Sequence, residues 1–298
     1  MKKVLSLILA AVLLAAVLSG CAATERRGTE VAVKYMGNNI RVAATSVATA
    51  EILDALGYNN VVGVPKVVTS PLPERYRNVT NLGSPMIPNS EVLVSVKPDL
   101  VLSPISLHEQ LQKQYDSLHL PCYFLDLESP DGMYRSIEDL GTILGREKQA
   151  EKLCSGYQNW KDSLQSRHKK GRAPRVLILM GLPGDYMACT DHSYVGSLVK
   201  LLGGKNLYTS SKSDFVQVNP EDMLKKNPDI ILRTSHAMPE QTRQMFDKEF
   251  RENAIWKHFD AVKAGRVYDL PNDLFGMSAK LNYREAVRYL EPLLYPGN

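Results

Sequence analysis

The chain contains an internal repeat with a spacing of 130 residues, and this repeat constrains the fold more than any other feature of the sequence. Residues 89–102 and 219–232 each carry a short helical stretch, a Pro-Asp turn and a run of three apolar residues. The two copies align without a gap, and a repeated unit of helix, turn and strand predicts two halves of similar fold. The corresponding pairs are Asn89 and Asn219, Glu91 and Glu221, Pro98 and Pro228, and Asp99 and Asp229.

Short apolar segments alternate with helical segments in both halves. In the first half, Arg41–Ala44 and Val61–Val64 are predicted strands, and Val47–Leu56 is a predicted helix. In the second half, Arg175–Met180 is a predicted buried strand. Short apolar strands that alternate with helices indicate a mostly parallel sheet. We therefore expect an α/β fold with two Rossmann-like lobes.

A long amphipathic helix is predicted between the two halves, over Glu147–His168. A stretch of this length spans roughly 33 Å, about the width of a small domain. Gly145 ends a shorter predicted helix, Ile137–Leu144. We interpret the long helix as a strut that joins the lobes; an ordinary helix packed on one domain is the alternative. Its apolar residues recur at steps of three and four, at Ala150, Leu153, Tyr157, Trp160 and Leu164.

The first twenty residues have the pattern of a secretory signal. Lys2 and Lys3 precede the uncharged apolar run Val4–Leu18, which is short for a membrane span. Leu18-Ser19-Gly20-Cys21 matches the lipobox of bacterial lipoproteins, in which the cysteine carries a lipid. A signal peptide followed by a chance cysteine is the alternative. We expect lipid at Cys21 to hold the protein at the membrane surface.

These patterns divide the chain into five segments. Residues 1–20 are the predicted signal peptide, and residues 21–38 are the lipidated N-terminus and tether. Two lobes of ordinary domain size then account for most of the mature chain. The predicted N-terminal lobe is 39–130, the connecting helical region is 131–171 and the C-terminal lobe is 172–298.

Composition excludes several classes of protein. The formal net charge of +4 falls to +2 without Lys2 and Lys3, which argues against an electrostatic nucleic-acid binder. Cys122, Cys154 and Cys189 remain after the lipidated cysteine. An odd number with no close pair implies neither a disulfide framework nor a thiolate zinc site.

The repeat also predicts where a ligand binds. Ligands of open α/β sheets lie at the carboxyl ends of strands. Two lobes joined by one helix would turn these ends toward each other across a cleft. We therefore expect Ser103–Leu107 in the first lobe and Arg233–Met238 in the second lobe to line this cleft.

Two side chains in these regions suggest iron ligands. His236 follows a predicted strand in a loop, where it can offer an imidazole nitrogen. Met86 stands between two prolines that restrict the backbone. Taken alone, His236 is better interpreted as a loop histidine bonded to backbone or water, and Met86 as a core residue. Together, one imidazole and one thioether are the ligand set of a six-coordinate haem iron.

The remaining histidines are weaker candidates. His192 precedes a predicted helix and is the reserve ligand. The other four stand among charged or helical surface residues, and we expect them to be solvated. No nucleophile elbow, phosphate loop or zinc-protease motif is present, so a binding protein is favoured over an enzyme. These four histidines are His108, His119, His168 and His258.

Several motifs resemble a known family over nearly the whole mature chain. The lipobox, the repeated Pro-Asp units, 193–196 (Ser-Tyr-Val-Gly) and 264–268 (Ala-Gly-Arg-Val-Tyr) look like a substrate-binding lipoprotein of iron-siderophore, cobalamin and haem ABC importers. The motifs around 83–88, 231–239, 255–259 and 274–280 are similar to the haem-binding lipoproteins of the iron-regulated surface determinant system of Gram-positive bacteria.

The resemblance implies roles for four residues. Met86 and His236 would be the axial haem ligands, one from each lobe. Glu91 and Glu221, which the repeat relates, would dock against basic residues of the two permease subunits. A glutamate at a helix start is also a favourable partner of the helix dipole, which is the alternative.

Haem carries two propionates, which need donors at the cleft mouth. Thr45 and Ser46 stand at a predicted helix start, where backbone N–H groups bind anions. Lys66, Ser70 and Lys280 are further candidates for haem contacts, and simple surface lysines are the alternative.

The expected protein is a lipid-anchored monomer on the outer face of the cell membrane. It takes up haem, with cell-wall haem carriers as candidate donors, and delivers it to an ABC permease and its ATPase. The strut would limit lobe motion to small angles. One alternative ligand is a ferric siderophore or cobalamin. An alternative class is a surface redox protein that uses bound haem.

Overall fold

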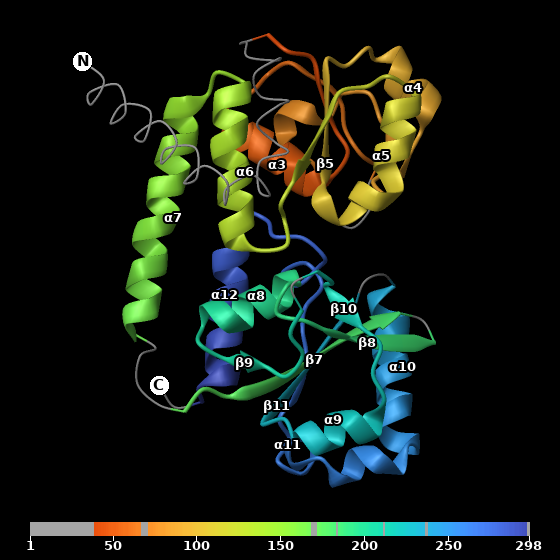
Figure 1. Cartoon of the computed structure of the whole chain (residues 1–298), viewed down its shortest axis with the longest axis vertical. Helices are drawn as coiled ribbons and strands as arrows, with labels where there is room; N and C mark the ends of the chain where they lie inside the picture. Colours follow the sequence, from red (N-terminus) through yellow and green to blue (C-terminus); the bar gives the residue numbers. More distant parts are fainter. Residues whose placement is uncertain are drawn as a thin grey trace, which may run out of the picture.

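The computed structural model describes residues 39–66, 71–167, 172–182, 184–210, 212–235 and 238–296 of the chain. The signal peptide, the tether and Cys21 lie outside these residues. Two α/β lobes, each with its own main sheet, lie one above the other (Figure 1). Helix α7 (Glu147–Arg167) runs along the side of the first lobe and reaches the side of the second, and α6 (Pro130–Ile143) lies between α7 and the first lobe. Within the described residues, no helix has the length and apolarity needed to cross a membrane.

The first lobe is built on a parallel four-stranded sheet. The strand order is β2-β1-β5-β6, and every neighbouring pair is parallel. The strands are β1 (Val42–Ala44), β2 (Val61–Gly63), β5 (Leu100–Pro104) and β6 (Cys122–Leu125), and the helical elements are α3 (Val47–Ala55), η1 (Glu74–Tyr76), α4 (Ser90–Ser95), η2 (Ile105–Leu107) and α5 (His108–Ser117). A separate hairpin consists of β3 (Gly83–Ser84) and β4 (Ile87–Pro88).

The second lobe has a mixed six-stranded sheet. The order is β10-β8-β7-β11-β12, and β9 pairs with β7. The pairs made by β8 are antiparallel and the others are parallel. The strands are β7 (Arg175–Leu182), β8 (Asp185–Cys189), β9 (Lys205–Asn206), β10 (Phe215–Val216), β11 (Ile230–Ser235) and β12 (Val267–Asp269), and the helical elements are α8 (Tyr194–Leu201), α9 (Pro220–Lys226), α10 (Pro239–Glu252), η3 (Ala254–His258), α11 (Asp260–Lys263) and α12 (Tyr283–Leu294). The predicted α/β class is confirmed.

The two copies of the repeat have the same local structure. Asn89 caps α4, because its Oδ1 accepts a hydrogen bond from the backbone N–H of Val92 at 3.0 Å. Asn219 caps α9 in the same way, accepting from Asp222 N–H at 2.9 Å. Side-chain oxygens at this position satisfy N–H groups that have no partner inside the helix.

The helix ends and strand starts also correspond. Lys97 and Asn227, 130 residues apart, are both left-handed, with φ of 47° and 44°. The Asp99 carboxylate accepts from the backbone N–H of Arg41, and the Asp229 carboxylate accepts from that of Arg175, both at 2.8 Å. Each aspartate therefore ties the start of one strand to the start of its parallel neighbour, which fixes the register of β5 on β1 and of β11 on β7.

The region between the lobes contains two long helices that pack together, and not one. α7 (Glu147–Arg167) packs against α6 (Pro130–Ile143), which is almost twice as long as the predicted helix Ile137–Leu144. The prediction began too late because Pro130-Asp-Gly resembles a turn. In the structure Ser129 accepts from Gly132 N–H at 3.0 Å, and Pro130 opens the helix without needing a donor. His168, the predicted last residue, lies outside the described residues.

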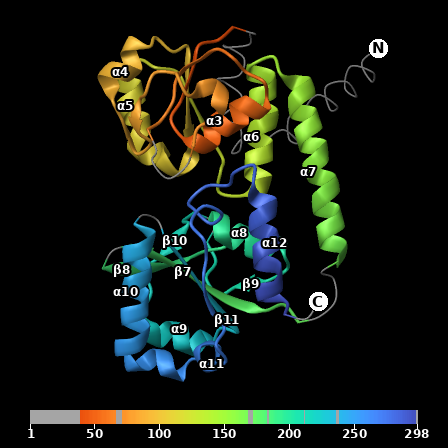
Figure 2. The same ribbon diagram turned by 180° about the vertical axis from the view of Figure 1, so that it is seen from behind.

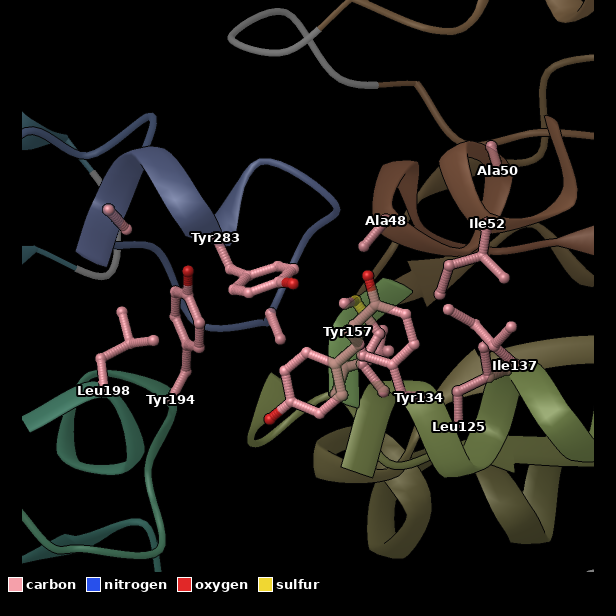
Figure 3. Close-up of a cluster of buried hydrophobic side chains, with 14 of the residues drawn as sticks. Ala48, Ala50, Ile52, Leu125, Tyr134, Ile137, Tyr157, Tyr194, Leu198 and Tyr283 are labelled. Carbon is pink, nitrogen blue, oxygen red and sulfur yellow. The ribbon is translucent and has the colours of Figure 1, made fainter. Parts of the chain in front are cut away.

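Four aromatic residues join the lobes at the strut. Tyr283 of α12 presents its ring to three neighbours at near-perpendicular angles: Tyr134 of α6 at 5.9 Å, and Tyr157 and Trp160 of α7 at 5.7 and 5.1 Å between ring centroids. Tyr134 and Tyr157 stack at 4.2 Å. Figure 3 shows Tyr283 lying between these two rings and Tyr194 of α8. Edge-to-face pairs of this kind add stability beyond their buried area.

The last helix of the chain therefore belongs to the junction. Arg284, next to Tyr283, donates from Nη2 to the Gly156 carbonyl of α7 at 2.8 Å and lies 5.3 Å from the Trp160 ring. Figure 2 shows α12 and α7 side by side from behind. The predicted boundaries 39–130, 131–171 and 172–298 stay a prediction. In the structure, α12 of the predicted C-terminal lobe packs on helices of the predicted connecting region.

We expect Tyr283→Ala to lower the free energy of unfolding by about 3–5 kcal/mol, the usual cost of removing a large buried aromatic side chain. Tyr289→Ala on the same helix is the control, because Tyr289 is exposed and pairs only with Phe275 among the aromatic contacts described. Its cost should stay below about 1.5 kcal/mol. Urea denaturation followed by circular dichroism measures both, and equal costs would contradict this account of the junction.

Candidate functional site

Met86 stands at the tip of the β3–β4 hairpin. The turn consists of Pro85 and Met86, between the paired residues Ser84 and Ile87. The Met86 side chain is 42% exposed and that of Ile87 is 71% exposed. The structure therefore excludes the alternative that Met86 is a core residue. Neighbouring exposed apolar side chains of this size are typical of a surface that binds a ligand or another protein.

Helix α5 supports this hairpin through two glutamines. Gln110 donates from Nε2 to the Met86 carbonyl at 2.8 Å. Gln114, one turn later, donates to the Pro88 carbonyl at 3.1 Å and to Ser90 Oγ at 2.8 Å. These bonds hold Met86 and the residues that follow it on the surface of one helix.

The other side of the hairpin is pinned by backbone bonds. The Lys66 N–H donates to the Gly83 carbonyl, and the Asn89 N–H donates to the Leu82 carbonyl, both at 2.8 Å. Gly83 has a φ of 88°, a conformation that glycine adopts without strain. The backbone that carries Met86 is thus fixed from both directions.

The second predicted iron ligand, His236, lies outside the described residues, and so does Ser70. Ser235, which precedes His236, is the last residue of β11. Met238, the next described residue, has a left-handed φ of 48° and a side chain that is 53% exposed. An exposed methionine therefore stands close in sequence to His236, as Ile87 does to Met86.

The predicted cleft lining is partly wrong. Strands β5 and β11 run further than expected, so Ser103, Arg233, Thr234 and Ser235 are buried strand residues. The Arg233 guanidinium bonds Asp269 at 2.7 and 2.5 Å and Asp247 at 2.9 Å, all within its own lobe. The prediction ended each strand with its apolar run, at Leu102 and Leu232, but both strands continue into residues that are not part of that run.

The side chains of Thr45 and Ser46 are buried and hold the turn after β1. Thr45 Oγ1 lies 2.7 Å from Ser103 Oγ, and Ser46 Oγ accepts from Thr49 N–H at 3.1 Å to cap α3. Their hydroxyl groups are thus engaged in the fold. Contact between this turn and an anion stays a prediction, and it rests on the backbone N–H groups at the helix start.

The two predicted lysines have different surroundings. The Lys66 side chain is exposed. Lys280, half-buried, comes from the second lobe and lies near Glu51 of α3 in the first lobe. Burial raises the pKa of Glu51, and the positive charge of Lys280 opposes that rise. Lys280 therefore already faces a carboxyl group across the lobe junction.

His192, the reserve ligand, makes contacts with two carboxylates. Its Nδ1 lies 2.8 Å from Asp214 Oδ1 and 3.3 Å from Glu128 Oε2. Burial and the charge of Asp214 raise the pKa of Glu128. Burial alone would lower the pKa of His192, but the hydrogen bond with Asp214 and the charge of Glu128 outweigh it and raise that pKa. The ring is thus engaged by neighbouring acids.

Glu91 and Glu221 are exposed in the first turns of α4 and α9. Their docking role stays a prediction.

Gln110 and Gln114, which support the hairpin of Met86, were not predicted from the sequence. Their spacing of four places them on one face of a helix, but it does not tell what that face contacts. The contacts of Glu128 and Asp214 with His192 were not predicted either, because no local pattern links these residues.

Comparison with protein families matches residues 42–274 to the model named Periplasmic binding protein. The high-affinity heme uptake system protein IsdE of Staphylococcus aureus is 41% identical over 256 residues, which cover 86% of this chain and 87% of that protein.

Two solved structures are also similar over both lobes. One is an ABC transporter substrate-binding protein from Listeria monocytogenes, with a TM-score of 0.81 and 44% identity, covering 86% of this chain and 99% of that one. The other is S. aureus IsdE complexed with heme, with a TM-score of 0.81, 41% identity and the same two coverages.

We expect Gln110→Ala to loosen the hairpin that carries Met86, because the Met86 carbonyl loses its side-chain partner. Hydrogen exchange measured by mass spectrometry should become faster for the segment 82–90, while the central strands stay protected. Gln112→Ala is the matched control on the same helix, since Gln112 bonds Asp116 and not the hairpin. Equal exchange in the two variants would count against this support.

Proposed function

We propose that this chain, which belongs to the periplasmic binding protein family, is an extracytoplasmic receptor that binds haem and delivers it to an ABC importer for iron acquisition. The observation that carries the proposal is the likeness to IsdE over both lobes, in sequence and in a structure solved with heme. Met86 and His236 give this chain a thioether and an imidazole with which to hold iron.

The iron ligands come from the two lobes. Met86 is presented by the β3–β4 hairpin of the first lobe, and His236 directly follows β11 of the second lobe. Since the two groups come from different lobes, Met86 and His236 would hold the iron between the lobes. This arrangement makes binding depend on the distance between the lobes.

The porphyrin is apolar, and its burial supplies most of the binding energy. The exposed side chains of Ile87, Ile105 and Met238 are suitable walls, since their burial against a ligand removes apolar area from water. The backbone at Thr45 and Ser46, together with Lys66, Ser70 and Lys280, supplies donors for the propionates. No bond in the haem is made or broken.

The membrane location follows from the N-terminus. A lipid on Cys21 would anchor the receptor to the outer face of the cell membrane next to the permease and its ATPase. Acyl chains contribute about 0.8 kcal/mol per buried methylene, so a lipidated cysteine needs no spanning helix.

A hemin titration tests the proposal. The unmodified protein should give a shifted Soret band with low-spin bands, and Met86→Ala and His236→Ala should each lose the low-spin bands. Each should also weaken binding by roughly tenfold or more, or 1.4 kcal/mol. Quenching of protein fluorescence by a ferric siderophore, with no spectral change on adding hemin, would contradict the assignment of haem as the ligand.

Two further variants separate ligation from packing. Met86→Leu keeps the apolar volume but removes the sulfur, so it should retain hemin and lose the low-spin bands. His258→Ala removes an exposed histidine of the second lobe and should leave the spectrum unchanged. A low-spin spectrum in Met86→Leu would exclude the methionine as a ligand.

Docking to the permease is expected to require Glu91 and Glu221. Reversal of both charges, in Glu91→Lys with Glu221→Lys, should lower haem-stimulated ATP hydrolysis by the reconstituted importer by about tenfold or more, with hemin binding unchanged. Glu147→Lys is the control, because Glu147 is also exposed at a helix start but lies outside the repeat. Equal loss in the control would assign the effect to general charge.

A further inference from the structure

A cluster of three potential metal ligands joins the two lobes and contains neither Met86 nor His236. Glu128 lies between β6 and α6 of the first lobe. His192 lies just before α8, and Asp214 just before β10, in the second lobe. One ligand atom from each residue lies within 4.8 Å of the other two.

The distances suit a shared cation. His192 Nδ1 lies 2.8 Å from Asp214 Oδ1 and 3.3 Å from Glu128 Oε2. Zinc binds imidazole nitrogen and carboxylate oxygen at about 2.0–2.2 Å, which separates neighbouring ligands on one ion by about 3–3.5 Å. Small side-chain rotations are therefore enough for all three to reach one ion.

The charge of the cluster also favours a divalent cation. A protonated His192 would leave two carboxylates against one positive charge, and its single Nδ1 proton points well at only one acceptor. The side chains of Glu128 and Asp214 are only 19% and 14% exposed, so an uncompensated charge there is costly. A divalent ion with neutral imidazole balances both carboxylates.

The second-lobe ligands are held in place before any ion binds. The Thr190 N–H donates to the Asp214 carbonyl at 2.8 Å, and the His192 N–H donates to Thr190 Oγ1 at 3.1 Å. At Gly196, an added Cβ would lie 1.9 Å from the Thr190 carbonyl, so only glycine allows this turn to sit so close to α8. The backbones of His192 and Asp214 are therefore both fixed relative to Thr190.

We propose that Glu128, His192 and Asp214 form a binding site for one divalent ion of the zinc class, and that this ion links the two lobes. An imidazole with two carboxylates is a zinc-type ligand set, with a water free to take the fourth position. Magnesium and calcium are disfavoured, because they take oxygen ligands. The site would restrict opening of the lobes, because its ligands come from both.

Isothermal titration with zinc chloride tests this site. The full chain, purified in detergent without a polyhistidine tag and without haem, is first stripped with a chelator. We expect one zinc ion per chain, and at least about tenfold weaker binding in both Glu128→Gln and Asp214→Asn. Loss of a group that merely orients a ligand already costs about 10–100-fold. Magnesium chloride should give no binding at the same concentrations.

Two measurements keep the result interpretable. The zinc-free melting temperature shows whether each variant folds, and zinc should raise this temperature in the unmodified chain but not in the variants. His258→Gln, which removes an exposed histidine, should bind zinc like the unmodified chain. Absence of zinc binding, or equal affinity in Glu128→Gln and the unmodified chain, would overturn the proposal. Hemin titration of the same variants separates this outcome from that of the haem site.

Discussion

Aromatic packing at the strut determines how the two lobes are held together. Tyr283, from the last helix of the chain, contacts the rings of Tyr134 and Tyr157 from the helices between the two sheets. One apolar core continues through this junction from the first lobe to the second, and each lobe has a separate smaller core elsewhere. Separation of the lobes would expose part of the shared core, so we infer that the lobes move by small angles about a stiff junction.

Under the proposed function, this constraint would hold the two halves of the haem site at a defined distance. Met86 is fixed by a hairpin that Gln110 and the backbone of Lys66 hold from two sides. His236 follows a strand whose register Asp229 sets by bonding the start of its neighbour. Hydrogen bonds therefore place Met86 and the strand that precedes His236 each within its own lobe, and the junction contributes to the distance between these two elements. Under the proposed function, affinity for haem would then depend also on the residues of the junction.

The internal repeat made much of the fold predictable. Asn89 and Asn219 cap helices, and Asp99 and Asp229 fix strand starts, because these roles depend on residues that are close in sequence or on one strand neighbour. Boundaries were less predictable where the pattern was ambiguous. Helix α6 starts at Pro130, although Pro-Asp-Gly resembles a turn, and β11 continues to Ser235, although its apolar run ends at Leu232.

Helix and strand periods, caps and turn residues act over a few positions, so local patterns were enough to predict the α/β class, the duplication and the long helix. The residue types and their neighbours along the chain also indicated Met86 and His236 as candidate ligands. The support of Met86 by Gln110, the nearness of Lys280 to Glu51 and the contacts of Glu128 with His192 and Asp214 arise only when the whole chain folds. These contacts join residues that are 24 to 229 positions apart, and no local pattern encodes which side chains meet once two lobes pack together.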